Sequence, residues 1–191
     1  SKFFGICGQM ENFGRFINPS NLYIPETQID ISKLGRKNGL QGQISCFILR
    51  SEYFQLVGRF NEELTHYEDF ELLLKLFSSW KLRTINKIVL RKRYHKQSLS
   101  NKNYEKSFLG GKKFLKLVSD KSLLPMPEIM LREKENFLTY GKQLLLHRNF
   151  DRAFQVFKDC FDSFPPDGPK EYFVSYLAIL HYKIKALFTS H

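Results

Sequence analysis

The sequence contains few cysteines, and their spacing excludes two common kinds of site. Its 191 residues include only three, Cys7, Cys46 and Cys160, and no two of them form a Cys-x-x-Cys pair. Such wide spacing supports neither a disulfide framework nor a zinc site, so we expect reduced thiols in a cytoplasmic protein. Long apolar runs are also missing, since none reaches the roughly 20 residues of a transmembrane helix.

The composition nevertheless indicates a folded protein. Aromatic residues make up 15% of the chain and hydrophobic residues 42%, which argues against disorder. The length is sufficient for one domain with a substantial core, with or without a helical appendage. The chain begins at Ser1 and enters an apolar Phe3-Phe4 pair almost at once, so we expect it to be a piece of a longer polypeptide.

Positive charge is concentrated in one stretch. The net charge is +11, and residues 81–116 account for all of it, because Glu105 is the one acidic residue among them. A cationic band attracts polyanions such as nucleotide diphosphates, anionic lipid headgroups or nucleic acid. For residues 102–116 a solvated basic surface is the alternative. We do not expect nucleic-acid binding, because zinc-finger spacing, an RNP-like aromatic strand and a basic helix leading into heptads are all missing.

A helix with two acidic residues in its first turn is predicted after Thr65. The apolar residues of one face recur at helical spacing: Phe70, Leu73, Leu74 and Phe77. Thr65 followed three residues later by Glu68 is a capping-box pattern, which predicts a start near His66. The helix dipole favours carboxylates in the first turn, so Glu68 and Asp69 could serve only as caps.

Motifs on both sides of this helix favour a further role. A Gly58-Arg59-Phe60 turn precedes it, and a predicted strand, 82–90, follows it. Beyond the strand come polar residues at fixed spacing: Tyr94, His95, Ser98 and Ser100. This order resembles the second half of the catalytic domain of family 2 glycosyltransferases, in which a Gly-x-Phe turn leads to a Glu-Asp pair, a strand and a late His. The resemblance covers residues 1–102.

The resemblance implies an α/β fold class. Residues 1–103 would form the C-terminal half of a GT-A-type domain with a mixed sheet, and residues 104–191 an all-α extension. In the extension we expect a helical hairpin at about 128–165 and a capping helix at 170–188. Four residues of the hairpin have tetratricopeptide-repeat spacing: Gly141, Ala153, Phe157 and Pro165. Any amphipathic hairpin with a small residue at its crossing would give the same pattern.

Sugar transfer from a nucleotide donor needs a base and positive charge near the departing diphosphate. The resemblance implies that Asp69 is the general base of an inverting reaction. Glu68 would orient Asp69 or contact the acceptor, with helix capping as its alternative. Arg93 or Lys96 could neutralise charge on the phosphates.

Two further segments are candidates for binding the donor and a metal ion. Residues Gly42, Gln43 and Ser45 resemble the segment that borders the donor sugar, with a strand-entry turn as the alternative. His95 could complete a metal site or contact the diphosphate, although a lone His in a polar loop is more often a surface residue. An imidazole suits Mn²⁺ better than Mg²⁺, which prefers oxygen ligands.

The family's first half carries a nucleotide-binding sheet and an Asp-x-Asp metal motif, and this sequence contains neither. We therefore expect an active parent glycosyltransferase with Mn²⁺ or Mg²⁺, and an inactive isolated piece. The implied partners are a nucleotide-sugar donor and a glycan or lipid-linked acceptor in cell-surface polysaccharide or glycan synthesis. The implied place is the cytoplasm, with peripheral contact at the inner face of the membrane as an option. The alternative is a basic helical interaction module that binds an acidic partner or a membrane surface.

Overall fold

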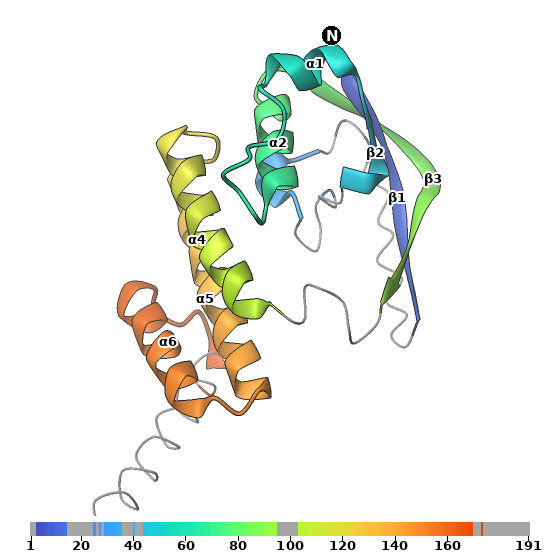
Figure 1. The fold of residues 1–191 in the computed structure, drawn as a ribbon. Coiled ribbons are helices and arrows are strands. Elements are labelled where there is room, and N and C mark those ends of the chain that lie inside the picture. The colour runs from blue at the N-terminus through green and yellow to red at the C-terminus, as the bar shows by residue number, and fades with distance from the viewer. Residues whose placement is uncertain are drawn as a thin grey trace, which may run out of the picture.

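The chain forms a mixed α/β unit followed by helices (Figure 1). The computed structural model describes the following residues: 3–14, 25, 27, 29–35, 40, 44–94, 103–169 and 173. A three-stranded sheet and two short helices precede α4, α5 and α6. The expected combination of a mixed sheet with later helices is therefore confirmed.

The sheet has the strand order β2-β1-β3. The central strand, β1 (Phe3–Gly14), is antiparallel to β2 (Phe47–Leu49) and parallel to β3 (Lys81–Tyr94). Parallel neighbours need a long connection, which here contains β2 and the first two helices. The carboxyl ends of β1 and β3 therefore lie at one edge, where Phe13 pairs with Arg93.

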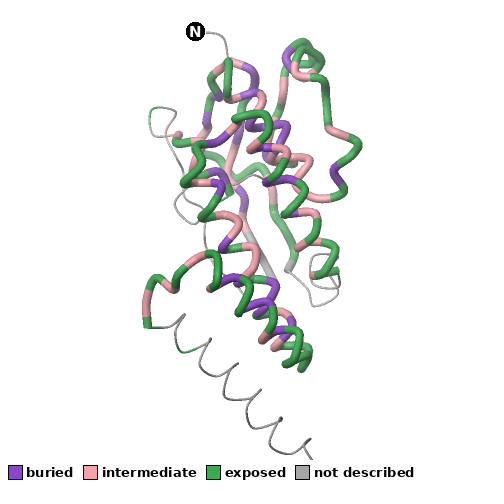
Figure 2. Tube along the Cα trace, turned by 90° about the vertical axis from the view of Figure 1, so that its left-hand side faces the viewer, coloured by how far each residue is buried: buried purple, intermediate pink, exposed green. Residues whose placement is uncertain are grey.

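Helices α1 (Ser51–Leu56) and α2 (Glu68–Phe77) lie between β2 and β3, and two 3₁₀ turns, η2 (Ile31–Lys33) and η3 (Ile44–Cys46), come before them. The apolar face of α2 is buried as predicted, with Leu72, Leu73 and Leu76 fully inaccessible. Figure 2 shows the same alternation of buried and exposed positions along the helices.

The start of α2 differs from the prediction. The helix begins at Glu68 behind Tyr67, which has a left-handed backbone with φ 66° and makes no side-chain cap. The side chain of Thr65 instead lies 3.2 Å from His66 Nδ1. The predicted capping box is wrong because the left-handed residue turns the chain between Thr65 and the helix, so that Thr65 is not at the N-cap position.

The later helices are α4 (Tyr104–Asp120), α5 (Met126–Leu146) and α6 (Phe150–Ser163). The last two pack on each other, and a Cβ added at Gly141 would lie 2.6 Å from the ring of Phe157. A small residue is therefore required at this crossing. Tetratricopeptide-like character and a domain boundary after residue 103 stay predictions, and the expected capping helix at 170–188 falls outside the described residues apart from Phe173.

Two apolar cores hold these elements together. The first combines the sheet and α2 with Phe114 and Val118 of α4. The second lies between α5 and α6, around Phe157 and Leu144. All three cysteines are buried and free, as expected for reduced thiols. None of the helices in the described part of the chain is both long enough and apolar enough to cross a bilayer.

Candidate active site at the start of helix α2

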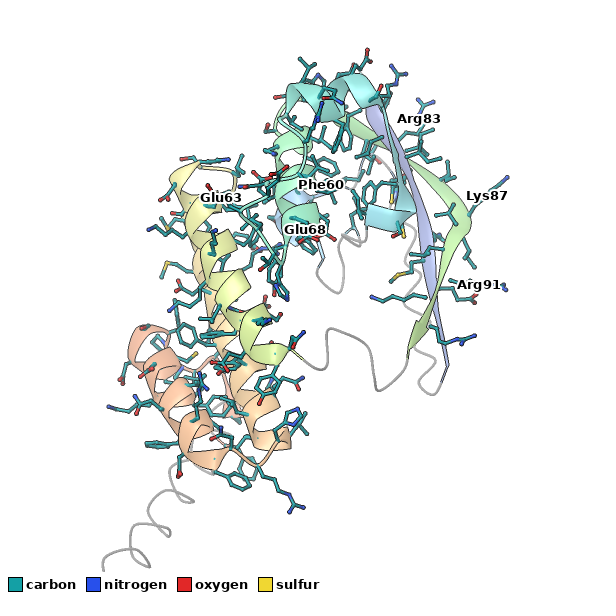
Figure 3. The ribbon with its side chains drawn as sticks, viewed as in Figure 1. Phe60, Glu63, Glu68, Arg83, Lys87 and Arg91 are labelled. Carbon is teal, nitrogen blue, oxygen red and sulfur yellow. The ribbon has the colours of Figure 1, made fainter. Side chains whose placement is uncertain are left out.

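The first turn of α2 is the end of this helix that lies nearer to the carboxyl ends of β1 and β3. A short turn at residues 78–80 joins α2 to β3, so the helix runs back along the strand. Figure 3 shows Glu68 of α2 and Arg91 of β3 at the same end of their elements. Ligands of α/β proteins gather at the carboxyl ends of parallel strands, which makes this edge the candidate site.

The Gly-x-Phe turn before α2 is fixed to the helix. Gly58 and Arg59 both have left-handed backbones, with φ of 82° and 61°. The ammonium of Lys75 donates to the carbonyl of Arg59 at 2.9 Å. It also lies 2.9 Å from Glu71 Oε2. The helix thus holds the preceding turn through one lysine.

Glu71 is a buried acidic residue with a structural role. Its side chain is fully inaccessible, and it has cations on both oxygens. Besides Lys75, the ammonium of Lys121 lies 3.4 Å from Oε1. Because Lys121 follows α4, this carboxylate connects α2, the Gly-x-Phe turn and the end of α4. No local sequence pattern indicates the role of Glu71, because its partner Lys121 is 50 residues away.

The residue before the helix, Tyr67, is held in a strained conformation. A left-handed backbone in an aromatic residue costs on the order of 1–3 kcal/mol, so packing must stabilise it. The ring of Tyr67 stacks on Phe114 of α4 with centroids 5.3 Å apart. Helix α4 also approaches through Gly110, where an added Cβ would lie 2.8 Å from His66 Cβ. Contacts with α4 therefore stabilise the backbone conformation at the start of α2.

The carboxylate of Asp69 is half-buried at this position. Its Oδ1 accepts a hydrogen bond from the backbone N–H of Phe70 at 2.8 Å. Burial raises the pKa of Asp69, and the adjacent charge of Glu68 raises it further, whereas the Phe70 N–H and the charge of Lys92 act in the opposite direction. A raised pKa makes this carboxylate a stronger base than an ordinary aspartate, which suits it to accept a proton.

Lys92 is a cation of β3 whose charge acts on Asp69 and on Cys46. Its charge lowers the pKa of Asp69 and also that of Cys46, although burial leaves the pKa of Cys46 raised overall. Arg91 has a different partner, since its Nε lies 2.9 Å from Glu11 Oε2. The structure thus brings the start of α2, the end of β3 and η3 together. Successive side chains of a strand point to opposite faces, so the sequence could have indicated that Lys92 faces away from the side of Arg91 and Arg93.

Half of the predicted site residues are described. Glu68 and Asp69 occupy the first turn of α2, Ser45 is exposed in η3, and Arg93 is exposed at the end of β3. Four others lie outside the described residues: Gly42, Gln43, His95 and Lys96. The proposed roles of all eight stay predictions.

The described residues do not by themselves fit a divalent metal ion. Within the described part of the chain, no three side chains of His, Cys, Asp or Glu gather as a metal site requires. Glu68 and Asp69 supply two carboxylates, whereas Mg²⁺ demands a near-octahedral set of ligands. No step of the reaction below is therefore assigned to a metal.

Comparison with known proteins relates the chain to one class of enzyme. It is 28% identical over 132 residues to an uncharacterized glycosyltransferase of Rickettsia conorii, and the match covers 65% of this chain. The similarity is therefore to part of one glycosyltransferase. The aligned region is 21% of that protein, so the chain spans about a fifth of the length of this relative. No protein-family model matches the chain, and no solved structure matches it.

Proposed function

We propose that this chain is part of an inverting glycosyltransferase of family 2, with a GT-A-type fold, in which Asp69 is the general base. The observation that carries the proposal is the half-buried carboxylate with a raised pKa in the first turn of α2, on which the charge of Lys92 of β3 acts. The relationship to a glycosyltransferase supports the reaction class. The sugar donor would be a nucleotide sugar and the acceptor a hydroxyl of a glycan or a lipid-linked glycan.

In this proposal Asp69 takes the proton of the acceptor hydroxyl. The acceptor oxygen forms a bond to the anomeric carbon, and the bond from that carbon to the nucleoside diphosphate breaks. The bonding electrons leave with the diphosphate, which gains negative charge. Lys92 of β3 would offset that charge, since its charge already acts on Asp69. Arg93, the next residue of the strand, is the alternative cation, with its side chain on the opposite face.

Other parts of the parent protein would complete the site. Mn²⁺ or Mg²⁺ would require ligands beyond Glu68 and Asp69, and the nucleotide-binding half would lie in the parent chain. The isolated piece is therefore proposed to be inactive. Adding the upstream residues of the parent should create Mn²⁺-dependent binding of a nucleoside diphosphate, measured by calorimetry.

The decisive test uses the parent protein with the substitution Asp69→Asn. Release of nucleoside diphosphate from a panel of nucleotide sugars should fall by about 10²–10⁴-fold, because a general base typically contributes that much. Asp120→Asn, an exposed change at the end of α4, is the matched control and should retain activity. Full activity in Asp69→Asn would overturn the assignment.

A second candidate function is attachment to an anionic surface, in the cytoplasm at the inner face of the membrane. The outer side of the sheet exposes paired apolar residues, Ile6 and Ile48, which are 40% and 76% accessible. Exposed cations of β3 lie beside them, including Arg83 and Lys87 (Figure 3). Binding to phosphatidylserine vesicles should then fall in an Arg83→Gln, Lys87→Gln variant and persist in Asp69→Asn. Equal binding by all three proteins would refute this candidate.

A further inference from the structure

The turn of α2 that carries Asp69 begins at a residue in an unfavourable conformation. Tyr67 has φ 66°, a left-handed backbone that residues with a side chain rarely adopt, and its side chain makes no capping hydrogen bond among the described residues. Its carbonyl closes the turn by accepting the backbone N–H of Glu71 at 3.0 Å. An uncapped helix start normally frays, because its first N–H groups lack partners. Packing must therefore hold Tyr67 if Asp69 is to stay in an intact turn.

Helix α4 supplies this packing through Phe114. The ring of Phe114 stacks on the ring of Tyr67, with centroids 5.3 Å apart and planes at 19° to each other. It also meets the ring of Phe70 edge to face, with centroids 6.4 Å apart. Phe114 is buried in the first core, which restricts its movement. One ring of α4 thus contacts the residues on both sides of the Glu68-Asp69 pair.

The same face of α4 also holds the segment that precedes α2. A Cβ added at Gly110 would lie 2.8 Å from the Cβ of His66, so the two segments approach closely. The ammonium of Lys113 donates to the carbonyl of Glu63 at 2.7 Å. Residues three and four positions apart share one face of a helix, so Gly110, Lys113 and Phe114 act together.

We propose that Phe114 is a positioning residue of the glycosyl transfer: by holding Tyr67 in its left-handed conformation, it keeps the first turn of α2 intact and Asp69 in place. The inference rests on the proposed function, which takes Asp69 as the base. Helix α4 packs in the same core as the sheet and α2. It is then required for transfer and is not an accessory to the α/β unit.

The first test measures amide hydrogen exchange in the chain by nuclear magnetic resonance. Phe114→Leu removes the stacked ring, so the Glu71 amide that closes the first turn should exchange about 5-fold faster. The reference is the Ser78 amide, which bonds to the Leu74 carbonyl at 3.1 Å at the other end of α2. An unchanged ratio of the two exchange rates would overturn the inference.

The second test measures transfer by the parent protein with the same substitution. At saturating substrates, Phe114→Leu should lower kcat about 5–10-fold and leave the KM for the donor unchanged, because only the turn that carries Asp69 is loosened. Phe157→Leu is the matched control, since it changes a buried ring of the second core and should retain kcat. Unaltered kcat in Phe114→Leu, with transfer lost in Asp69→Asn, would refute the positioning role alone. Full transfer in Asp69→Asn would instead refute the proposed function.

Rescue distinguishes positioning from a general loss of stability. Glycine adopts the left-handed backbone of residue 67 without strain, whereas alanine does not. In the Phe114→Leu background, Tyr67→Gly should therefore restore kcat to within about 3-fold of that of the unaltered protein, while Tyr67→Ala should not. Both double variants lose the same two rings, so a role in stability alone predicts equal kcat values. Equal values would overturn the proposal.

A variant that keeps the ring tests the same contact if Phe114→Leu does not fold. Gly110→Ala favours the helical conformation of α4, but its Cβ would lie 2.8 Å from that of His66 and must displace one of the two segments. It should therefore lower kcat and accelerate exchange of the Glu71 amide in a folded protein. Retention of both values would refute the proposal.

Discussion

Two carboxylates in the same helix, two residues apart, have opposite surroundings. Glu71 is fully inaccessible and has Lys75 and Lys121 at 2.9 and 3.4 Å from its oxygens. Asp69 is half-buried, and the hydrogen bond described for it comes from the backbone N–H of Phe70. Burial raises the pKa of Asp69, and the charge of Lys92 offsets only part of that effect. The middle of α2 is therefore suited to a structural role, and its first turn to the proton transfer that we propose.

This difference predicts that substitution of Glu71 changes mainly the stability of the fold, whereas substitution of Asp69 changes mainly the proposed activity. A carboxylate with two close cations is already in a favourable environment, so removing its charge harms the fold. A partly buried carboxylate with little charge compensation destabilises the fold. Natural proteins retain such destabilising residues at functional sites. Substitutions along α2 can test the contrast directly.

The largest effect on stability is expected from Glu71→Gln. The change preserves the shape of the side chain but leaves two lysines around a buried neutral group. The free energy of unfolding should fall by about 3–5 kcal/mol, as for other broken buried ion pairs. Urea unfolding followed by circular dichroism measures it, with the exposed Glu62→Gln as control. A loss below about 1 kcal/mol would contradict the structural role.

An intermediate effect is expected from Lys75→Met. This lysine binds both Glu71 and the carbonyl of Arg59, and its side chain is only 15% exposed. The expected loss is about 1–3 kcal/mol. Lys121→Met is the matched comparison, because its side chain is 50% exposed and it should lose less than about 1 kcal/mol. Urea unfolding of both variants measures the two losses. A larger loss in Lys121→Met than in Lys75→Met would show that the ion pair with the end of α4 contributes more than the one within α2.

The smallest effect, with the opposite sign, is expected from Asp69→Asn. The folded-state pKa of Asp69 is raised, so its contribution to stability is largest below the ordinary value of 3.8 and is lost as pH rises through the folded pKa. The Asn variant avoids this loss, and its thermal midpoint at pH 7 should rise by roughly 1–3 °C. The gain should disappear at pH 3. A lower midpoint at pH 7 would mean that the carboxylate stabilises the fold.

Local patterns in the sequence predicted much of the fold. The apolar spacing of Phe70, Leu73 and Leu74 gave a helix with a buried face, and the alternation over residues 82–90 gave a strand, which the structure extends to Lys81–Tyr94. The separate hairpin helices were also visible from their own periodicity. These features depend on neighbours a few residues apart, which a single sequence displays.

The remaining features depend on contacts between distant residues. The helix begins at Glu68 because Tyr67 stacks on Phe114, far along the chain, and the capping-box pattern does not contain that contact. The effect of Lys92 on Asp69 likewise requires the parallel pairing of β3 with β1. No local pattern predicts any of these.

The parallel pairing of β1 with β3 has a consequence for the order of folding. β2, α1 and α2 lie between the two strands, so a long loop must close before Phe3 can pair with Lys81. Such distant pairing is slow, whereas α5 and α6 are joined by a short turn and can associate early. We expect a newly made chain to acquire its helical hairpin first. The sheet and the adjoining start of α2, which carries Asp69, would then be the last part of the molecule to assemble.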